Sequence, residues 1–486
     1  MCYRGRMIPR LGLLLAAAVP IACLPDNPPG DTDTATGTSS STSDGTGADV
    51  AGIFSCDQPT CTFLLVSQTL DDRVDVYEVA SDPALRGRID VDLKPDPSGF
   101  QTEGDLLDEP YGIVLDATDL HVLVGHYPAR EKGSLITFPL DAFADVTPGG
   151  VYGVDAYFDG KGTFSAGARG LALDRQEAIF ALPHPSGRLL VGVFNNDIRA
   201  IDWPTAGQLL IVDPADPDTA SIGAFDLAGL DEPCLGAWGL VALDDAVTSV
   251  ALACDGSDSV AVLDLPADLG AGDPAVEAGK ISGCGVALAA GASWTTRFLA
   301  PDGAGKVLAV QSQLLAAPRL WTVDGSCKAV PSTTSLGAGY EDLRLFNEVA
   351  LVTPAGGGQP ATWLIAATTP DPGIYVVRGG AAPGVCGRVD GFDAALTAGN
   401  APYALALAAD GSRLAVGAGP LSNPELAEGR GQILWAGLDL ASVGECAIVA
   451  TTVTDLNEGR YVASDPKTWV RAPNVVHIHE VAGGGA

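Results

Sequence analysis

Basic residues and aromatic residues are scarce in this chain of 486 residues. There are 27 Lys and Arg against 60 Asp and Glu, so the net charge is −33, and aromatic residues make up 6% of the sequence. A protein that binds nucleic acid needs a cationic face to neutralise phosphates, so this charge argues against a nucleic-acid partner.

Catalytic sequence motifs are also missing. The sequence contains no G-x-S-x-G, no H-E-x-x-H and no C-x-x-C-H, the patterns of a hydrolase nucleophile, a zinc protease and a c-type haem site. Beyond the first 22 residues, no stretch reaches the 18 or so uncharged apolar residues of a transmembrane helix. These observations favour a protein that is not an enzyme and that needs no cofactor and no metal.

Glycine, proline and apolar residues are plentiful. The chain has 60 Gly and 34 Pro and is 47% hydrophobic. This apolar content excludes a wholly disordered chain, and so much Gly and Pro argues against a long helical bundle. A single core seldom grows beyond about 250–300 residues, so the length predicts several domains or one repetitive architecture.

The first 22 residues have the pattern of an export signal. Three Arg precede a short apolar stretch, and Cys23 follows the sequence Pro-Ile-Ala. This pattern resembles a bacterial lipoprotein signal, which implies a lipid on Cys23. Pro20 departs from the aliphatic residue usual at that position, and the alternative is ordinary cleavage that releases a secreted protein. The sequence therefore predicts a protein of the cell envelope, with the outer membrane favoured.

Residues 23–50 follow the signal as a polar tether. From residue 25 to residue 49 they are Pro, Asp, Asn, Gly, Thr or Ser, apart from Ala35 and Ala48. Such a segment cannot bury apolar surface and is expected to stay disordered. We therefore predict three parts: a signal peptide at 1–22, a lipidated and disordered tether at 23–50, and a folded domain at 51–486. The membrane is an expected partner, through the lipid.

Eight cysteines remain in the predicted domain, and an even number in an exported chain predicts disulfides. Cys56 and Cys61 are close neighbours in the sequence and should form a local bridge. Cys234 and Cys254 lie one strand apart and form a second predicted pair. The other four cysteines have no partners that the sequence alone can assign.

One plan repeats through residues 62–480: a small or aromatic opening residue, an apolar strand, a turn, then two or three more strands. The segment 249–264 (SVALACDGSDSVAVLD) and the segment 405–416 resemble the YVTN-type β-propeller repeat. That resemblance implies an all-β radial propeller but no particular activity. The openers are the segments 110–116, 168–174, 237–243, 296–299, 340–345 and 402–407.

Six openers and an incomplete first unit predict a seven-bladed propeller. The segments 62–68, 73–79 and 87–93 look like three strands that lack an opener, and residues 472–478 align with the opener at 401–407. We therefore expect the C-terminal strand to pair with the first blade and close the ring, which hides two sheet edges at once.

The loops before the innermost strands should rim one mouth of the central channel, and they supply the candidate ligand site. Guanidinium groups there could bind an anionic ligand, with aromatic faces beside it. The alternative is that these Arg pair with acids and that the aromatic residues fill the channel. The candidate residues are Tyr111, Arg169, Trp238, Arg297, Arg344, Tyr403 and Arg471.

His477 and His479 alternate with Ile478 on the closing strand, which places both rings on one face. Without a third ligand at a set spacing, packing between blades is the better interpretation of this pair than a metal site.

Three functions are consistent with these features. The first is a binding module whose ligand, a protein, a glycan or an anionic small molecule, lies at the axial mouth. The second is a propeller enzyme such as a lactonase or a sugar dehydrogenase, and the third is a structural envelope protein. The first is favoured because the chain has a predicted anchor and tether and lacks catalytic motifs.

Overall fold

The chain divides into two units, Met1–Val50 and Ala51–Ala486, and all described residues belong to the second. The predicted signal, Cys23 and the tether therefore lie outside the described residues. The computed structural model describes residues 52–69, 73–80, 83–91, 107–127, 133–145, 150–153, 169–173, 177–194, 207–215, 222–288, 295–312, 318–331, 336, 339–420, 431–458, 473 and 475–482.

The unit Ala51–Ala486 is built from strands, as the sequence predicts. In order across the sheet, the first sheet contains β29 (Val476–Ala482), β1 (Thr60–Gln68), β2 (Arg73–Glu78), β3 (Ala84–Asp90) and β7 (Gly150–Gly153). The second contains β4 (Leu107–Leu115), β5 (Asp119–Tyr127), β6 (Ser134–Pro139) and β8 (Arg169–Ala172). The third contains β9 (Glu177–Pro183), β10 (Leu189–Phe194), β11 (Gln208–Val212) and β12 (Ile222–Asp226).

Three further sheets follow along the chain. The fourth contains β13 (Ala237–Ala242), β14 (Ser249–Cys254), β15 (Ser259–Asp264) and β16 (Ser282–Ala287). The fifth contains β17 (Thr295–Pro301), β18 (Lys306–Ser312), β19 (Arg319–Asp324) and β20 (Ala329–Pro331). The last has eight strands: β21 (Arg344–Thr353), β22 (Thr362–Thr369), β23 (Gly373–Arg378) and β24 (Gly384–Asp390), then β28 (Ile448–Asp455), β27 (Gln432–Asp439), β26 (Arg413–Pro420) and β25 (Asn400–Leu407).

Helical segments are short and connect strands. The described ones are η1 (Leu140–Asp145), η4 (Leu227–Gly229), α1 (Pro274–Ala278), η5 (Asp393–Ala395) and η6 (Val443–Glu445). None of the helices within the described ranges is long and apolar enough to cross a membrane.

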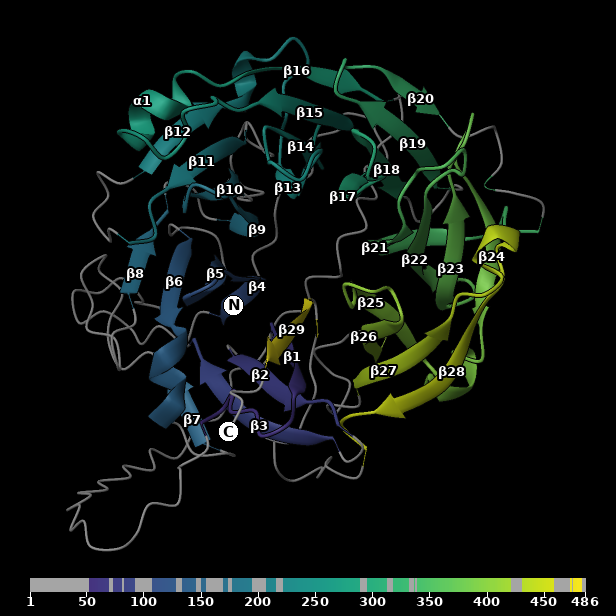
Figure 1. Ribbon diagram of the computed structural model, residues 1–486. Helices are drawn as coiled ribbons and strands as arrows, with labels where there is room; N and C mark the ends of the chain where they lie inside the picture. The colour runs from purple at the N-terminus through teal and green to yellow at the C-terminus, as the bar shows by residue number, and fades with distance from the viewer. Residues whose placement is uncertain are drawn as a thin grey trace, which may run out of the picture. The chain divides into compact units, whose positions relative to one another are not determined.

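The sheets surround a common axis, with one inner strand from each, except that the eight-stranded sheet supplies both β21 and β25 (Figure 1). The inner strands contact one another in sequence, from β4 to β9, β13, β17, β21, β25 and β29, and β29 contacts β4 again. Both faces of most strands are buried between neighbouring sheets. On β14, Val250 and Leu252 join one apolar cluster while Ala251 and Ala253 join another. This explains why the strand is apolar at nearly every position rather than at alternate ones.

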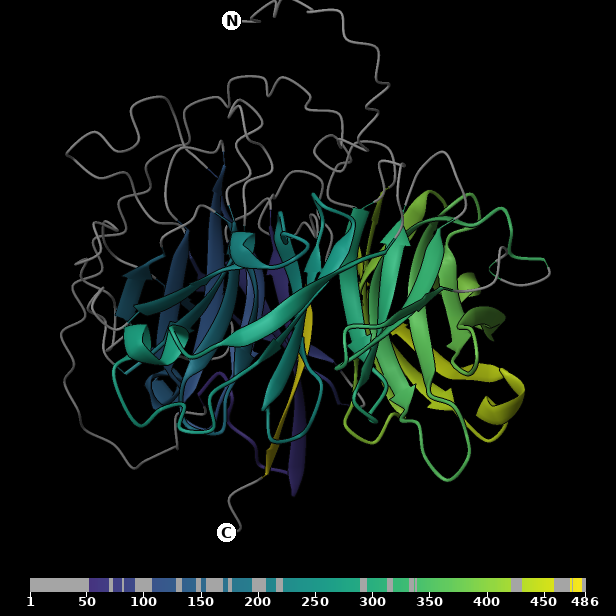
Figure 2. The same ribbon diagram turned by 90° about the horizontal axis from the view of Figure 1, so that it is seen from above.

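The C-terminal strand closes the ring, as predicted. Strand β29 pairs antiparallel with β1, in a register that runs from Thr60 opposite Ala482 to Val66 opposite Val476. The two strands run side by side in both views (Figures 1 and 2). The pairing joins the last described strand of the domain to its first and covers the inner edge of β1.

Two hairpins predicted from Asp-Gly-Ser turns are confirmed. Val250 pairs with Leu263 across the first turn, and Leu405 pairs with Val416 across the second. In the second turn, Gly411 has φ +70, a backbone conformation that glycine adopts at little cost.

Two expected openers were misplaced. Residues 169–172 do not form an inner strand: β8 pairs with β6 at the outer side of the second sheet, and β9 is the inner strand of the next. The alternating apolar pattern of this segment is explained by packing instead, because Leu171 and Leu173 contact apolar residues of the third sheet. The opener expected at 340–345 begins later, since β21 starts at Arg344.

Four disulfides join the described strands and turns. Cys56–Cys61 and Cys234–Cys254 match the predicted pairs. Cys284–Cys327 and Cys386–Cys446 were not assigned from sequence. Each of the latter two links one four-strand unit to the next at its outer side: Cys284 lies on β16 and Cys386 on β24. Four disulfides indicate an oxidising, extracytoplasmic compartment.

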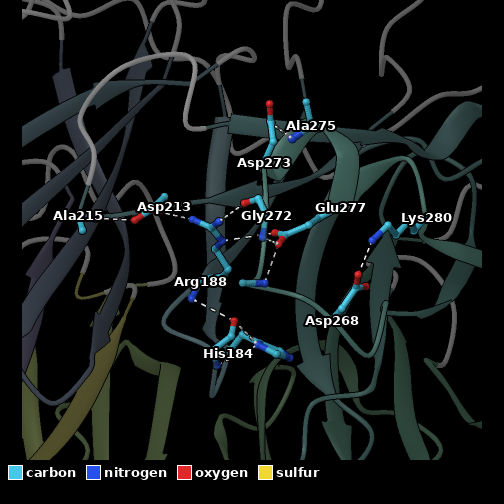
Figure 3. Close-up of polar contacts among 12 residues, drawn as sticks. His184, Arg188, Asp213, Ala215, Asp268, Gly272, Asp273, Ala275, Glu277 and Lys280 are labelled. Carbon is cyan, nitrogen blue, oxygen red and sulfur yellow. Dashed lines mark hydrogen bonds and ion pairs between the residues drawn. The ribbon is translucent and has the colours of Figure 1, made fainter.

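A buried ion-pair cluster ties α1 to the third sheet (Figure 3). Arg188 precedes β10 and contacts Asp213, and its Nη2 donates to the Gly272 carbonyl over 2.6 Å. Its Nε lies 3.4 Å from Oε2 of Glu277, which is 1% exposed. Oε1 of Glu277 accepts from the backbone N–H groups of Gly270 and Gly272. Because its charges are paired within the cluster, we interpret it as a structural clamp between neighbouring sheets.

Replacing Gly239 on β13 should destabilise the domain. An added Cβ would lie 2.6 Å from the Arg297 carbonyl oxygen of the next inner strand. We expect Gly239→Ala to lower the free energy of unfolding by about 1–3 kcal/mol, because the two strands would have to move apart. Chemical denaturation measures the change. Gly325→Ala is the matched control, since no heavy atom lies within 4 Å of that Cβ position, and an equal loss in both variants would contradict the interpretation.

Candidate functional site

Four of the predicted site residues lie at matching positions on inner strands, where the β-ladder is irregular. On each of these strands the register with the neighbouring strand shifts by at least one residue. The strand register skips Tyr111 on β4, Trp238 on β13, Arg297 on β17 and Tyr403 on β25. A β-bulge leaves a residue out of the ladder and redirects its side chain. The sequence repeats therefore identified a real structural position.

Strand β21 carries different residues at this position. Its register shifts between Phe346 and Val349, so Asn347 and Glu348 occupy the bulge. Arg344, the residue predicted from sequence, lies at the start of the strand, where its Nη1 donates to the carbonyl oxygens of Glu341 and Leu343 over 2.7 Å. Nδ2 of Asn347 donates to the Pro402 carbonyl over 3.2 Å and so links two inner strands.

Arg297 and Trp238 form a pair between two neighbouring inner strands. The guanidinium carbon lies 4.3 Å from the centre of the indole ring, and Nε of Arg297 donates to Oδ2 of Asp255 over 3.1 Å. The ring of Phe194 lies 5.9 Å from the ring of Trp238, centre to centre. Burial raises the pKa of Asp255, and the nearby Arg297 offsets part of that effect. Arg297 thus has an acid partner and an aromatic partner.

The remaining predicted residues are less closely grouped. Arg169 lies on the outer strand β8, where its Nη2 is 3.3 Å from Oδ1 of Asp119, and so it is not at the axis as expected. Tyr403 donates its hydroxyl to the Pro420 carbonyl over 2.9 Å, and burial raises its pKa to about 12. Arg471 lies outside the described residues.

An axial cavity of about 230 Å³ lies between the inner strands of four successive sheets. Its walls come from β9, β13, β17 and β21, and most of the side chains are apolar. Among the described residues that line it, Glu348 is the only titratable one. The wall also includes Phe180, Leu240, Val241, Phe298 and Leu351.

The Glu348 carboxyl group is strongly affected by this environment. Desolvation raises its pKa from 4.5 to about 8, and a hydrogen bond from the backbone N–H of Val349 offsets part of the shift. At neutral pH the side chain is therefore mostly a neutral carboxylic acid. In that form it can donate or accept a hydrogen bond, and it can ionise when a cation arrives. Perturbed acids in cavities are typical of functional sites.

The sequence pattern did not reveal Glu348. The repeat at 340–345 is indistinct, and placing the opener there puts the bulge too early by several residues. Aligning Asn347 and Glu348 with Trp238 and Gly239 would have found the position, since an apolar strand follows both.

The stability of the protein should depend on pH through Glu348. Between its unfolded pKa near 4.5 and its folded pKa near 8, the folded protein binds more protons than the unfolded chain, so stability falls as pH rises. Glu348→Gln cannot ionise. Between pH 5 and pH 8 we expect the free energy of unfolding of the wild type to fall by about 3 kcal/mol relative to that of the variant. Urea denaturation at several pH values measures this, and a constant difference would contradict it.

The two histidines of β29 are packed among other side chains. Desolvation lowers the pKa of His477 to about 4 and also lowers that of His479. The ring of His479 meets the ring of Phe54 edge to face, with 5.6 Å between the centres. Within the described ranges, no group of three Cys, His, Asp or Glu is arranged to hold a metal.

Solved structures with the same arrangement of strands identify the fold. A periplasmic gluconolactonase of Pseudomonas aeruginosa is 11% identical, with a TM-score of 0.52, and the match covers 87% of this chain and all of that one. A protein of Bacteroides fragilis assigned as a 6-phosphogluconolactonase is 9% identical, with a TM-score of 0.50, over 87% of this chain and 99% of that one. No family model and no curated protein matches the sequence. The domain is an all-β protein with the β-propeller fold.

Proposed function

We propose that this chain is an exported, lipid-anchored propeller of seven blades that acts as a binding module at the cell envelope, with a small ligand in the axial cavity. The export pattern before Cys23 and the polar tether support the anchor. The blade number is supported by the eight-stranded sheet, which consists of two four-stranded units joined only by a short parallel pairing of β24 with β28. The similarity of the segment 249–264 to YVTN-type repeats is consistent with this architecture.

One observation carries the binding proposal: residues on the inner strands of four sheets line a cavity in which Glu348, whose pKa is raised by desolvation, is the one acid among the described residues. Apolar cavities with one polar group are typical of small-molecule sites, in which the walls contribute affinity and the polar group sets orientation. The predicted residues Trp238 and Arg297 precede cavity-lining residues on the same strands and could contribute at its rim. Glycans, proteins and anions remain candidate ligands for this mouth.

A thermal-shift screen with small anions, neutral sugars and amines tests the site. A compound that stabilises the wild type should bind at least about tenfold more weakly to Phe298→Trp, whose larger ring fills the cavity. Phe54→Trp is the matched control, because Phe54 packs in a different apolar cluster. If ligands bind equally well to both variants, the axial site is wrong.

A lactonase is the second candidate function, and Glu348 is the observation that favours it. An acid with a pKa near 8 can transfer a proton at neutral pH, as a general acid does in ester hydrolysis. We expect such an enzyme to hydrolyse glucono-δ-lactone or its 6-phosphate, and Glu348→Gln to lower kcat/KM by about a hundredfold or more. Absence of turnover by the wild type with both lactones would reject this candidate.

The predicted anchor has its own test. Cys23→Ala should move the protein from the membrane fraction to the soluble fraction, because one or more acyl chains would supply the attachment of a body that carries a strong negative charge. Fractionation and labelling with a radioactive fatty acid measure the change. A variant that stays with the membrane would contradict lipidation at this residue.

A further inference from the structure

We propose that the axial cavity is selective for small organic cations, with the ammonium group of the ligand against the Glu348 carboxylate and its apolar part against Phe180 and Phe298. This inference rests on the proposed function in one respect, that the cavity is the ligand site. It differs from the expectation that Arg residues at the mouth select an anion.

The charges around the cavity favour a cation. Glu348 is the only titratable group among the described residues that line it, and neither Lys nor Arg is among them. The nearest candidate by sequence is Arg297, but its guanidinium is held by Asp255 and by the ring of Trp238. A buried carboxylate is expensive unless a positive charge accompanies it. A cationic ligand would supply that charge, whereas an anion would meet the carboxyl group with no cationic side chain to offset it.

The aromatic residues of the wall fit the same ligand. Phe180 comes from β9 and Phe298 from β17, so they approach the cavity from two different sheets. The negative face of an aromatic ring attracts a desolvated ammonium group, and the attraction is larger in a site that excludes water. A carboxylate combined with aromatic rings is a suitable set for an amine and a poor one for a sugar phosphate.

The size of the cavity limits how large such a ligand can be, and the negative charge of the protein favours a cation. A volume of about 230 Å³ equals roughly eight water molecules at about 30 Å³ each, which suits a compact amine such as benzylamine. The net charge of −33 raises the local concentration of cations around the protein, so an amine would be attracted at low ionic strength.

Binding of a cation should release a proton. The neutral carboxyl group loses its proton to the buffer, and the resulting carboxylate pairs with the ammonium group, so charge and atoms balance. With a pKa of about 8, close to nine-tenths of the Glu348 side chains are protonated at pH 7, so we expect about one proton to be released for each amine bound.

Isothermal titration calorimetry with three probes of similar shape tests the proposal: benzylamine, benzyl alcohol and benzoate. We expect benzylamine to bind at least about tenfold more tightly than either of the others. Repeating the titration at pH 7 in buffers with different ionisation enthalpies should show the release of about one proton. Glu348→Gln should abolish both the preference and the proton release, and Glu480→Gln, which removes a charge from an exposed position on β29, should change neither.

Each outcome decides the matter. If benzyl alcohol binds as tightly as benzylamine and no proton is released, the cation preference is wrong but the axial site stands. If none of the three probes binds, the cation inference is overturned. The thermal-shift screen with Phe298→Trp then tests independently whether the axial cavity binds any ligand. Proton release by the wild type remains informative even if Glu348→Gln does not fold.

Discussion

Deleting residues 470–486 should unfold the whole domain rather than only loosen one sheet. The deletion removes β29, which pairs with β1 along nearly its full length and supplies the inner strand of the first sheet. It would expose the inner edge of β1, which carries Phe63 and Leu65, both fully buried. Domain stability is usually about 5–15 kcal/mol, and the loss of a complete inner strand with its packing on both faces is expected to exceed it.

Circular dichroism, thermal unfolding and limited proteolysis would measure the effect of this deletion. Removal of residues 483–486 alone is the matched control, since it leaves β29 intact. We expect the control to unfold cooperatively like the wild type. A cooperative transition of similar midpoint in the longer deletion would contradict the closed ring.

Removing the two disulfides that join neighbouring units should have the next largest effect. Cys284–Cys327 spans 43 residues and Cys386–Cys446 spans 60. By the loop-entropy relation, loops of this length stabilise the folded state by about 4 kcal/mol each, because the crosslink restricts the unfolded chain. The double variants Cys284→Ser/Cys327→Ser and Cys386→Ser/Cys446→Ser should therefore each show a markedly lower urea midpoint.

The short bridge Cys56–Cys61 is the control for this prediction, since its separation of five residues gives only about 2 kcal/mol by the same relation. We expect the order of losses to follow loop length. A loss in the Cys56→Ser/Cys61→Ser variant as large as that in the Cys386→Ser/Cys446→Ser variant would show that strain or packing, not loop length, determines the effect.

Local patterns predicted the parts of the fold that depend on neighbouring residues. The Asp-Gly-Ser turns located hairpins because the turn conformation and the two flanking strands lie within one short segment. The C-terminal strand was placed on β1 because residues 472–478 share the spacing of an opener. The pairing of Cys284 with Cys327, and of Cys386 with Cys446, depends instead on how adjacent sheets pack, which no local pattern encodes.

The error at Arg169 has the same origin. A short run of small and apolar residues suits an inner strand and an outer strand equally, because an outer strand can also place apolar side chains against the next sheet, as β8 does with Leu171. Only the pairing of Arg169 with Thr137 on β6 distinguishes the two, and that pairing is not visible in the sequence. The opener pattern therefore located the register shifts of the inner strands where an aromatic residue preceded Gly or Ala, and it failed where the pattern was generic.

Glu348 could not be recognised as a candidate for a different reason. A single Glu in an acidic chain carries no signal by itself, and its importance comes from apolar neighbours on three other strands. Its pKa is raised because Phe180, Leu240 and Phe298 surround the same cavity, and these residues are far from it in sequence.

Carbon-13 NMR of protein labelled at the glutamate carboxyl groups tests the central claim most directly. The Glu348 resonance is assigned by its absence in Glu348→Gln. We predict that it titrates near pH 8, well above the other glutamates, and that saturating benzylamine moves this titration to lower pH. A resonance that titrates near pH 4.5 and does not respond to the amine would contradict a desolvated axial acid and the site built on it.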